Sequence, residues 1–247
     1  MTHPLSRIDA VGALTAALAP HGLDLIGTAA VPDYDADVPD HAALARLVPG
    51  ARSVIVVGNG GGAFWGAFQA ACARNPGRRE VAHPLDAFTR EVVDAAVARV
   101  GIAGVVLYPF DFPAVPVSFV RLGECAGLGR RSLLGVLLHP VYGPWIALRA
   151  AVAVPDAVAA PRPADGFDPC PGCVERACIA ACPAHAVSKV GWDVPRCAAF
   201  RARDDDPCAA CCHARVECVI GRAHRYPPDA LAYHQGRARP LLVAHAR

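Results

Sequence analysis

The sequence lacks long apolar runs, a secretion signal and an excess of either charge. No stretch reaches the about 18 apolar residues that a membrane-spanning helix needs, because Gly, Pro or Arg interrupts each candidate. The first residues, MTHPLSRIDA, contain no apolar segment typical of a secretion signal. Because 24 Lys and Arg nearly balance 22 Asp and Glu, the composition lacks the excess of basic residues that is typical of proteins that bind nucleic acid. We therefore expect a cytoplasmic protein that neither spans a membrane nor binds nucleic acid.

A complete nucleotide-binding motif is also missing. Residues 58–62, Gly-Asn-Gly-Gly-Gly, follow a strand-like run and precede a helical pattern, and backbone N–H groups at such a turn can bind a phosphate. The segment has neither the Gly-Lys-Ser/Thr ending of a P-loop nor the spacing of a dinucleotide site. Gly58, Asn59 and Gly60 are therefore predicted either to form a tight turn or to contact a phosphate of a cofactor.

Hydrophobic periodicity predicts helices and strands that alternate through the first 154 residues. This pattern indicates an α+β fold, with a mixed sheet flanked by helices. A linker rich in Pro and Ala, residues 156–168, separates a first domain, 1–157, from a second, 168–247. Ser6 is the expected cap of the first helix. The predicted helices are 8–18, 41–47, 64–73 and 84–100, and the predicted strands are 23–30, 53–58, 105–110, 133–138 and 145–154, the last two joined by a turn at 139–144.

Cysteine is concentrated in the second domain, where nine of the eleven cysteines lie between residues 170 and 218. The first four are separated by two, four and three residues, and a Pro follows the fourth. Bacterial ferredoxins separate their cluster cysteines by two, two and three residues before a Cys-Pro. This run therefore fits an iron–sulfur cluster in which a loop at 174–177 is longer by two residues.

The remaining cysteines are numerous enough for a second cluster. In two-cluster ferredoxins, the fourth cysteine of such a run binds the other cluster. By this logic, one predicted cluster is bound by Cys170, Cys173, Cys178 and Cys218. The other is bound by Cys182, Cys197, Cys208 and either Cys211 or Cys212, and the Cys-x2-Cys spacing favours Cys211.

Two other uses of these cysteines stay open. A disulfide framework is typical of small secreted chains, which this sequence does not resemble. Structural zinc is the stronger alternative, because Cys-x2-Cys pairs are common zinc ligands and His213 follows Cys212. The Cys-Pro ending and the nine cysteines favour iron–sulfur clusters over zinc.

Further motifs precede the cysteine run. They are Pro116-Val117, Ala-Gly-Leu-Gly at 126–129, Leu133-Leu134, His-Pro-Val-Tyr-Gly-Pro at 139–144, and Arg149. With its motifs in this order, the chain resembles the epoxyqueuosine reductase and reductive dehalogenase group. Residues 84–89 resemble, more weakly, a segment of the related cobalamin-processing decyanase. Those proteins join a nitroreductase-like, cobalamin-binding domain to a C-terminal ferredoxin-like lobe with two [4Fe-4S] clusters.

The resemblance implies a reductase, or a cobalamin-processing protein, that passes single electrons from clusters to a base-off cobalamin. It implies a soluble electron donor, such as a ferredoxin or flavodoxin, and a small-molecule or corrinoid substrate. Pro113 stands where epoxyqueuosine reductase has its acidic proton donor, which leaves Asp111 and Tyr142 as the candidates. An electron-transfer or redox-sensing protein without a corrinoid is the alternative. The expected cofactor contacts are Gly58, Asn59, Gly60, Gly127, Gly129, His139, Tyr142 and Gly143.

Overall fold

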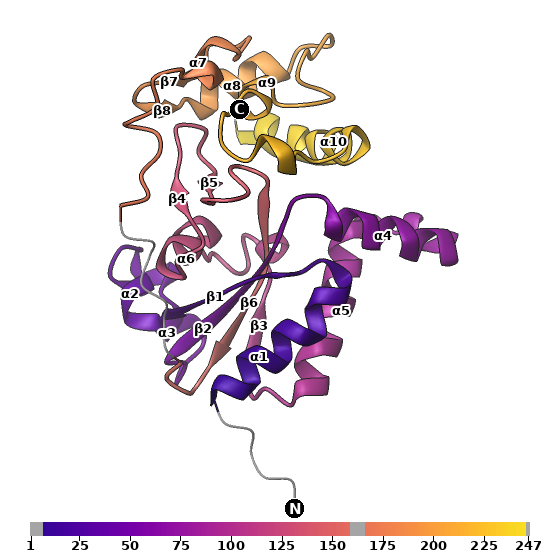
Figure 1. Cartoon of the computed structure of the whole chain (residues 1–247), viewed down its shortest axis with the longest axis vertical. Helices are drawn as coiled ribbons and strands as arrows, with labels where there is room; N and C mark the ends of the chain where they lie inside the picture. The colour runs from indigo at the N-terminus through magenta and orange to yellow at the C-terminus, as the bar shows by residue number, and fades with distance from the viewer. Residues whose placement is uncertain (1–6, 159–165, 246–247) are drawn as a thin grey trace, which may run out of the picture. The chain divides into compact units, whose positions relative to one another are not determined.

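The computed structural model describes residues 7–158 and 166–245, so the predicted cap Ser6 lies outside the described residues. Its internal contacts divide the chain into two compact units (Figure 1). Unit 1 comprises residues 1–128 and 147–165, and unit 2 comprises 129–146 and 166–247. The predicted domain boundary, 1–157 and 168–247, stays a prediction; the compact units differ from it by grouping 129–146 with the C-terminal part.

Unit 1 is organised around a four-stranded sheet with the order β1-β2-β6-β3. All eight residues of β2 (Ser53–Gly60) are buried, as expected of a central strand rich in β-branched residues. It pairs antiparallel with β1 (Leu25–Ala30). On its other side lies β6 (Ile146–Val154), which pairs antiparallel with the edge strand β3 (Val105–Leu107).

Helices cover this sheet, and two of them, α1 (Arg7–Leu18) and α5 (Pro84–Val100), pack side by side (Figure 1). Pro in the first turn and a left-handed Gly101 at the end bound α5 as the sequence predicts. The helix α4 (Ala63–Arg74) starts directly after the Gly-rich turn. The other helical segments of unit 1 are η1 (Ala19–His21), α2 (Val31–Asp35), η2 (Asp40–Ala42), α3 (Leu44–Leu47), η3 (Pro76–Arg79), η4 (Pro109–Asp111) and α6 (Phe119–Cys125).

Two glycines of unit 1 provide a matched test of this packing. Gly22 and Gly101 both cap a helix with φ +73, but a Cβ on Gly101 meets open space, whereas a Cβ on Gly22 would lie 2.5 Å from the Ala63 carbonyl carbon. We expect Gly101→Ala to lower the free energy of unfolding by about 1–2 kcal/mol through backbone strain alone. Gly22→Ala should lower it by about 1–3 kcal/mol more, because α4 must move. Urea denaturation of both variants checks this, and equal losses would contradict the packing at Gly22.

Unit 2 is built from short elements around a small core. Cys182, Ala184, Ala186, Val187 and Ala214 form the centre of this core. The helices α8 (Val194–Arg201) and α10 (Pro228–His245) lie side by side (Figure 1). The other elements are β4 (Arg130–Arg131), β5 (Leu137–Leu138), α7 (Ala177–Ala180), β7 (Val187–Ser188), β8 (Gly191–Trp192), α9 (His213–Val216) and η5 (Arg222–His224).

The α+β prediction is confirmed, but one predicted strand pair is wrong. The runs 133–138 and 145–154 were expected as two strands joined by a turn. Instead, β5 is only Leu137–Leu138 and pairs with β4, while β6 belongs to the large sheet. The reason is a tight turn at Ser132, whose hydroxyl and backbone N–H both bond to the carbonyl of Val136, so the apolar residues between them do not extend. No described helix is long and apolar enough to cross a membrane.

Candidate functional site

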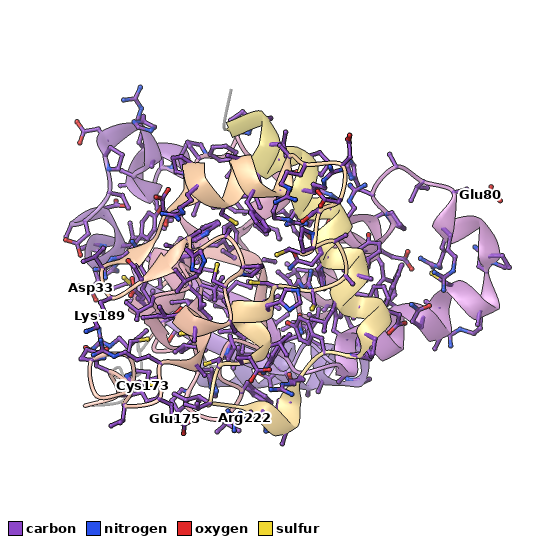
Figure 2. The ribbon with its side chains drawn as sticks, turned by 90° about the horizontal axis from the view of Figure 1, so that it is seen from above. Asp33, Glu80, Cys173, Glu175, Lys189 and Arg222 are labelled. Atoms are coloured by element: carbon purple, nitrogen blue, oxygen red, sulfur yellow. The ribbon has the colours of Figure 1, made fainter. Side chains whose placement is uncertain are left out.

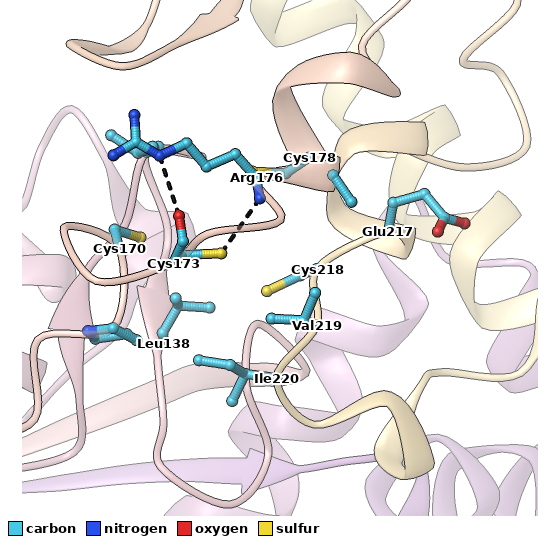
Figure 3. A pocket seen from close by; sticks show the side chains of 12 residues that line it. Leu138, Cys170, Cys173, Arg176, Cys178, Glu217, Cys218, Val219 and Ile220 are labelled. Atoms are coloured by element: carbon cyan, nitrogen blue, oxygen red, sulfur yellow. Dashed lines mark hydrogen bonds between the residues drawn. The ribbon is translucent and has the colours of Figure 1, made fainter.

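Four cysteines of unit 2 line one cavity (Figure 3). The cavity is partly open to solvent. In Figure 3 the sulfur atoms of Cys173 and Cys218 point toward the space between them. Leu133, Leu138, Val219 and Ile220 supply apolar walls. The cysteines are Cys170, Cys173, Cys178 and Cys218, the set that the sequence predicts for one cluster.

A left-handed residue accommodates the longer loop between the second and third of these cysteines. Arg176 has φ +43, a conformation that non-glycine residues adopt at a cost. Its backbone N–H thereby donates to Sγ of Cys173 at 3.4 Å, and its Nε donates to the Cys173 carbonyl at 3.1 Å (Figure 3). The extra residues bulge outward, with Val174 95% exposed, and α7 then begins at Ala177 and carries Cys178.

The loop is also held from outside. Arg222 Nη2 lies 3.8 Å from Oε2 of Glu175, and Figure 2 shows these two side chains at the same edge of unit 2 as Cys173. Both charged groups are at least half exposed, so the pair adds little free energy. It joins the loop that follows Cys173 to the segment that follows Cys218.

The thiols around the cavity lie close enough to raise the pKa of two among them, Cys178 and Cys218. Burial raises the pKa of the Cys178 thiol, and the charges of Cys218, Cys170 and Cys173 raise it further. Burial raises the pKa of Cys218 in the same way, opposed by a hydrogen bond with the backbone of Ile220. Thiolates crowded into a poorly solvated space favour a positively charged ligand between them.

A second group of thiols gathers around the small core of unit 2. Cys197 and Cys212 pack against the core that contains Cys182. Burial, followed by the charges of Cys212 and Asp206, raises the pKa of Cys208 to about 11. Burial also raises the pKa of Cys212, where Cys197 and Cys182 add to the effect. Of the predicted second set, the structure therefore brings Cys182, Cys197 and Cys208 together, and of the two alternatives for the fourth ligand it places Cys212 with them.

The turn at 139–144 is anchored within unit 2. His139 and Gly143 exchange two backbone hydrogen bonds of 2.8 and 2.9 Å. A Cβ on Gly143 would lie 2.6 Å from the carbonyl carbon of Ile220, and a Cβ on Gly221 would lie 2.5 Å from the Gly143 nitrogen. Arg215 Nε donates to the Pro144 carbonyl at 3.1 Å. The turn thus packs directly against the segment that follows Cys218.

His139 and Tyr142 belong to a ring cluster in this turn. The Tyr142 ring centre lies 5.1 Å from that of His139 and 4.8 Å from that of His224. Nδ1 of His139 accepts the backbone N–H groups of Val141 and Tyr142 at 3.1 and 3.3 Å. The fold therefore needs a neutral imidazole with a free lone pair on Nδ1.

We expect His139→Asn to remove part of the acid sensitivity of unit 2. Burial, and then the charge of His224, lowers the pKa of His139, so its contribution to stability is complete above the unfolded pKa of about 6.5 and is lost as the pH falls toward the folded pKa. An Asn oxygen can accept the same N–H groups without titrating. Unfolding free energies of the two proteins should agree at pH 8, and the wild type should lose more at pH 5.5. Parallel losses would contradict the prediction.

The Gly-rich turn of unit 1 is internally bonded. Gly58 and Gly60 are buried within β2, and the Gly60 N–H donates to Oδ1 of Asp24 at 3.4 Å. Asn59 accepts from Nε of Arg149 at 2.9 Å and donates to the Gly61 carbonyl at 3.2 Å. A carboxylate on the Gly60 N–H repels phosphate, so the tight-turn interpretation fits this geometry better than a phosphate cradle.

The glycines of the Ala-Gly-Leu-Gly stretch have backbone roles. Gly127, with φ +70, follows the end of α6, where the Gly127 N–H donates to the Glu124 carbonyl at 3.1 Å. Gly129 belongs to unit 2, and a Cβ there would lie 2.8 Å from the carbonyl carbon of Leu138. The two glycines thus permit a helix end and a close strand approach.

The proposed proton donor Asp111 is held in an ion pair. Arg90 Nη2 lies 2.6 Å from Oδ1 of Asp111, and the Arg90 guanidinium stacks 4.2 Å from the ring centre of Tyr108. Asp86, which no sequence pattern marks as a site residue, is a half-buried carboxyl whose pKa burial raises, against the charges of Arg149 and Arg90. Asp111 and Asp86 lie in unit 1, whereas Tyr142 lies in unit 2.

Among the described residues, no group of three or more His, Cys, Asp or Glu is arranged to hold a single metal ion. The two cysteines before the run behave as ordinary side chains. Cys72 is buried on α4, and Cys125 is half-buried at the end of α6, where its thiol donates to the Asp33 carbonyl at 3.6 Å.

No family model matches the sequence, and no curated protein matches it significantly. Solved structures share its fold. The B12-trafficking protein CblC of C. elegans has a TM-score of 0.62 at 13% identity, over 96% of both chains. An epoxyqueuosine reductase with a tRNA stem loop has a TM-score of 0.58 at 15% identity, over 90% of this chain and 68% of the other. A catabolic reductive dehalogenase with 3-bromo-4-hydroxybenzoic acid has 0.54 at 19%, over 98% and 36%. The expected likeness to this group is therefore confirmed in fold.

Proposed function

We propose that this chain is an iron–sulfur reductase whose two [4Fe-4S] clusters, both bound in unit 2, pass single electrons to a corrinoid. The observation that carries the proposal is the cavity lined by Cys170, Cys173, Cys178 and Cys218. Thiols from two distant segments around one space match the donor set of a cubane cluster. The donors therefore fit the group, although the ferredoxin-like character of unit 2 stays part of the proposal.

The residues around the cavity would tune such a cluster, which when bound supplies one-electron transfer. Hydrogen bonds to the sulfurs and exclusion of solvent set the reduction potential of a cluster. The Arg176 N–H is bonded to the Cys173 sulfur, and the Ile220 backbone to that of Cys218. Leu133, with the other apolar wall residues, limits water.

The corrinoid part of the proposal rests on the shared fold. The B12-trafficking protein and the two reductases are the relatives that support it. The predicted contacts Gly129 and Gly143 pack against backbone, and Gly60 is bonded to Asp24, so the residues that would hold the corrinoid stay a prediction. We propose a soluble donor such as a ferredoxin or flavodoxin, and a small-molecule or corrinoid substrate in the cytoplasm. The small net charge of +2 is the reason for proposing no nucleic acid.

Anaerobic purification followed by metal analysis tests the proposal. We expect about eight irons per chain and a brown protein whose addition to cobalamin, with reductant, shifts the corrinoid spectrum to the base-off form. Zinc with no colour would overturn the iron–sulfur assignment. Equilibrium dialysis under reducing conditions, with free cobalamin as the probe, measures the corrinoid part separately.

One group of observations favours a second candidate, an electron carrier or redox sensor without a corrinoid. Asp111 is ion-paired with Arg90, and the glycines Gly127, Gly129 and Gly143 among the expected corrinoid contacts have backbone roles. Iron clusters without any corrinoid shift would support this function and would contradict the first.

A further inference from the structure

The adjacent pair Cys211 and Cys212 offers two thiols where a second cluster needs one. Under the proposed function, the other three ligands of this second cluster are Cys182, Cys197 and Cys208. The sequence favours Cys211, because it completes a Cys-x2-Cys pair. The structure distinguishes the two thiols by direction, by packing and by the loop that joins them to Cys208.

The first difference between Cys211 and Cys212 is the direction in which their side chains leave the backbone. Cys212 has φ −82 and ψ 106, an extended conformation. Consecutive side chains of extended backbone point to opposite sides, which favours only one of the two thiols facing a given site. Cys212 caps α9 (His213–Val216), in which Ala214 belongs to the buried core of unit 2.

Packing then identifies which thiol faces inward. Cys212 packs against the core that contains Cys182, and Cys197 packs against the same core. Cys212 therefore lies among the other predicted ligands.

The loop before α9 brings in the last ligand. Nε2 of His213 lies 3.0 Å from the Pro207 carbonyl, which closes the segment 207–213 on itself. The Cys208 N–H donates to Oδ1 of the buried Asp206 at 2.9 Å, which fixes that end of the loop. The closed loop returns the chain from Cys208 to Cys212, so the two thiols border the same short loop.

We infer that Cys212, and not Cys211, is the fourth ligand of the second cluster, with Cys182, Cys197 and Cys208. This inference rests on the proposed function, since it assigns a ligand to a cluster that the proposal requires. It replaces the Cys-x2-Cys pairing with a Cys-x3-Cys pairing in this chain. Cys211 is then a half-buried free thiol beside the site.

Serine variants test the assignment by iron content. We expect Cys211→Ser to keep all of the iron and an unchanged electron paramagnetic resonance spectrum after reduction. Cys212→Ser should lose about half of the iron, because one cluster of two is lost. Loss of half of the iron in Cys211→Ser, or full retention in Cys212→Ser, would overturn the inference.

Alkylation of the unmodified full chain provides a measurement that needs no variant to fold. The anaerobic, iron-containing protein is treated with iodoacetamide and digested for mass spectrometry. We expect label on Cys211 and none on Cys212 until the iron is removed by a chelator. Label on Cys212 with protection of Cys211 would overturn the assignment alone, whereas wild-type protein that binds no iron would overturn the proposed function itself.

Discussion

Replacing Arg201 by Met is expected to lower the free energy of unfolding by about 3 kcal/mol. Arg201 is 3% exposed, and its Nε donates to Oδ2 of Asp206 at 3.2 Å, with both side chains at 4% exposure or less. Removing one partner of a buried ion pair costs about 3–5 kcal/mol, because the other charge is left buried. We expect the lower end, since Arg239 Nε lies 3.6 Å from the same carboxylate and remains. Arg201 also donates to the Gln235 carbonyl at 3.1 Å, which joins α8 to α10.

A second ion pair in the same loop serves as the control. Arg203 Nη2 lies 2.8 Å from Oδ2 of Asp205, but the two side chains are 52% and 70% exposed. Water solvates either charge after its partner is removed, so Arg203→Met should leave the unfolding midpoint nearly unchanged. Urea denaturation of both variants under anaerobic conditions measures the difference. Similar shifts in the two variants would show that the Arg201 pair is not buried in solution.

Arg201→Met should also disturb the second group of cysteines, because Arg201 and Cys208 both bond to Asp206. Asp206 accepts the Cys208 N–H on one oxygen and Arg201 on the other. Without Arg201, the carboxylate is free to turn toward Arg239 and water, which releases the Cys208 backbone. Iron content of Arg201→Met, compared with Arg203→Met, reports this local effect separately from global stability.

The elements with strong boundary residues could be predicted from the sequence. The helix 84–100 was predicted at both ends, because Pro84 and Gly101 act locally. The buried strand 53–58 was predicted two residues short, since glycines can continue an extended strand as well as end it. The helices α8 and α10 were missed. Pro240 lies inside α10. The start of α8 does carry a local signal, since Asp193 caps it by accepting the Arg196 N–H and a Pro lies in its first turn.

Part of the candidate site could likewise be predicted from the sequence, and part could not. Spacing could group Cys170, Cys173 and Cys178 with the distant Cys218, because ferredoxin loops impose a known order on their ligands. Spacing could not choose between Cys211 and Cys212, since it counts residues and not the directions of their side chains. Likewise, the role of Asp111 depends on Arg90, a partner from another helix that no local pattern reveals.

Paired serine variants should reveal which cysteines share a cluster. Cys218→Ser and Cys197→Ser belong to different predicted sets, so each should lose about half of the iron, about four of eight atoms. Cys125→Ser is the control, because this thiol is half-buried in unit 1 and outside both sets. It should keep all of the iron, and iron loss there would mean that the assay reports general instability.

The double variants separate shared from independent sites. Cys170 and Cys218 line the same cavity, so the double variant Cys170→Ser/Cys218→Ser should lose no more iron than Cys218→Ser alone, because the second ligand belongs to a cluster already lost. In contrast, Cys197→Ser/Cys218→Ser removes one ligand from each set and should bind no iron. The effects of two substitutions on iron content do not add when both remove ligands of one cluster, whereas they add when each removes a ligand of a different cluster. If the first pair adds and the second does not, the ligand sets are interchanged and the cavity holds a different combination of thiols.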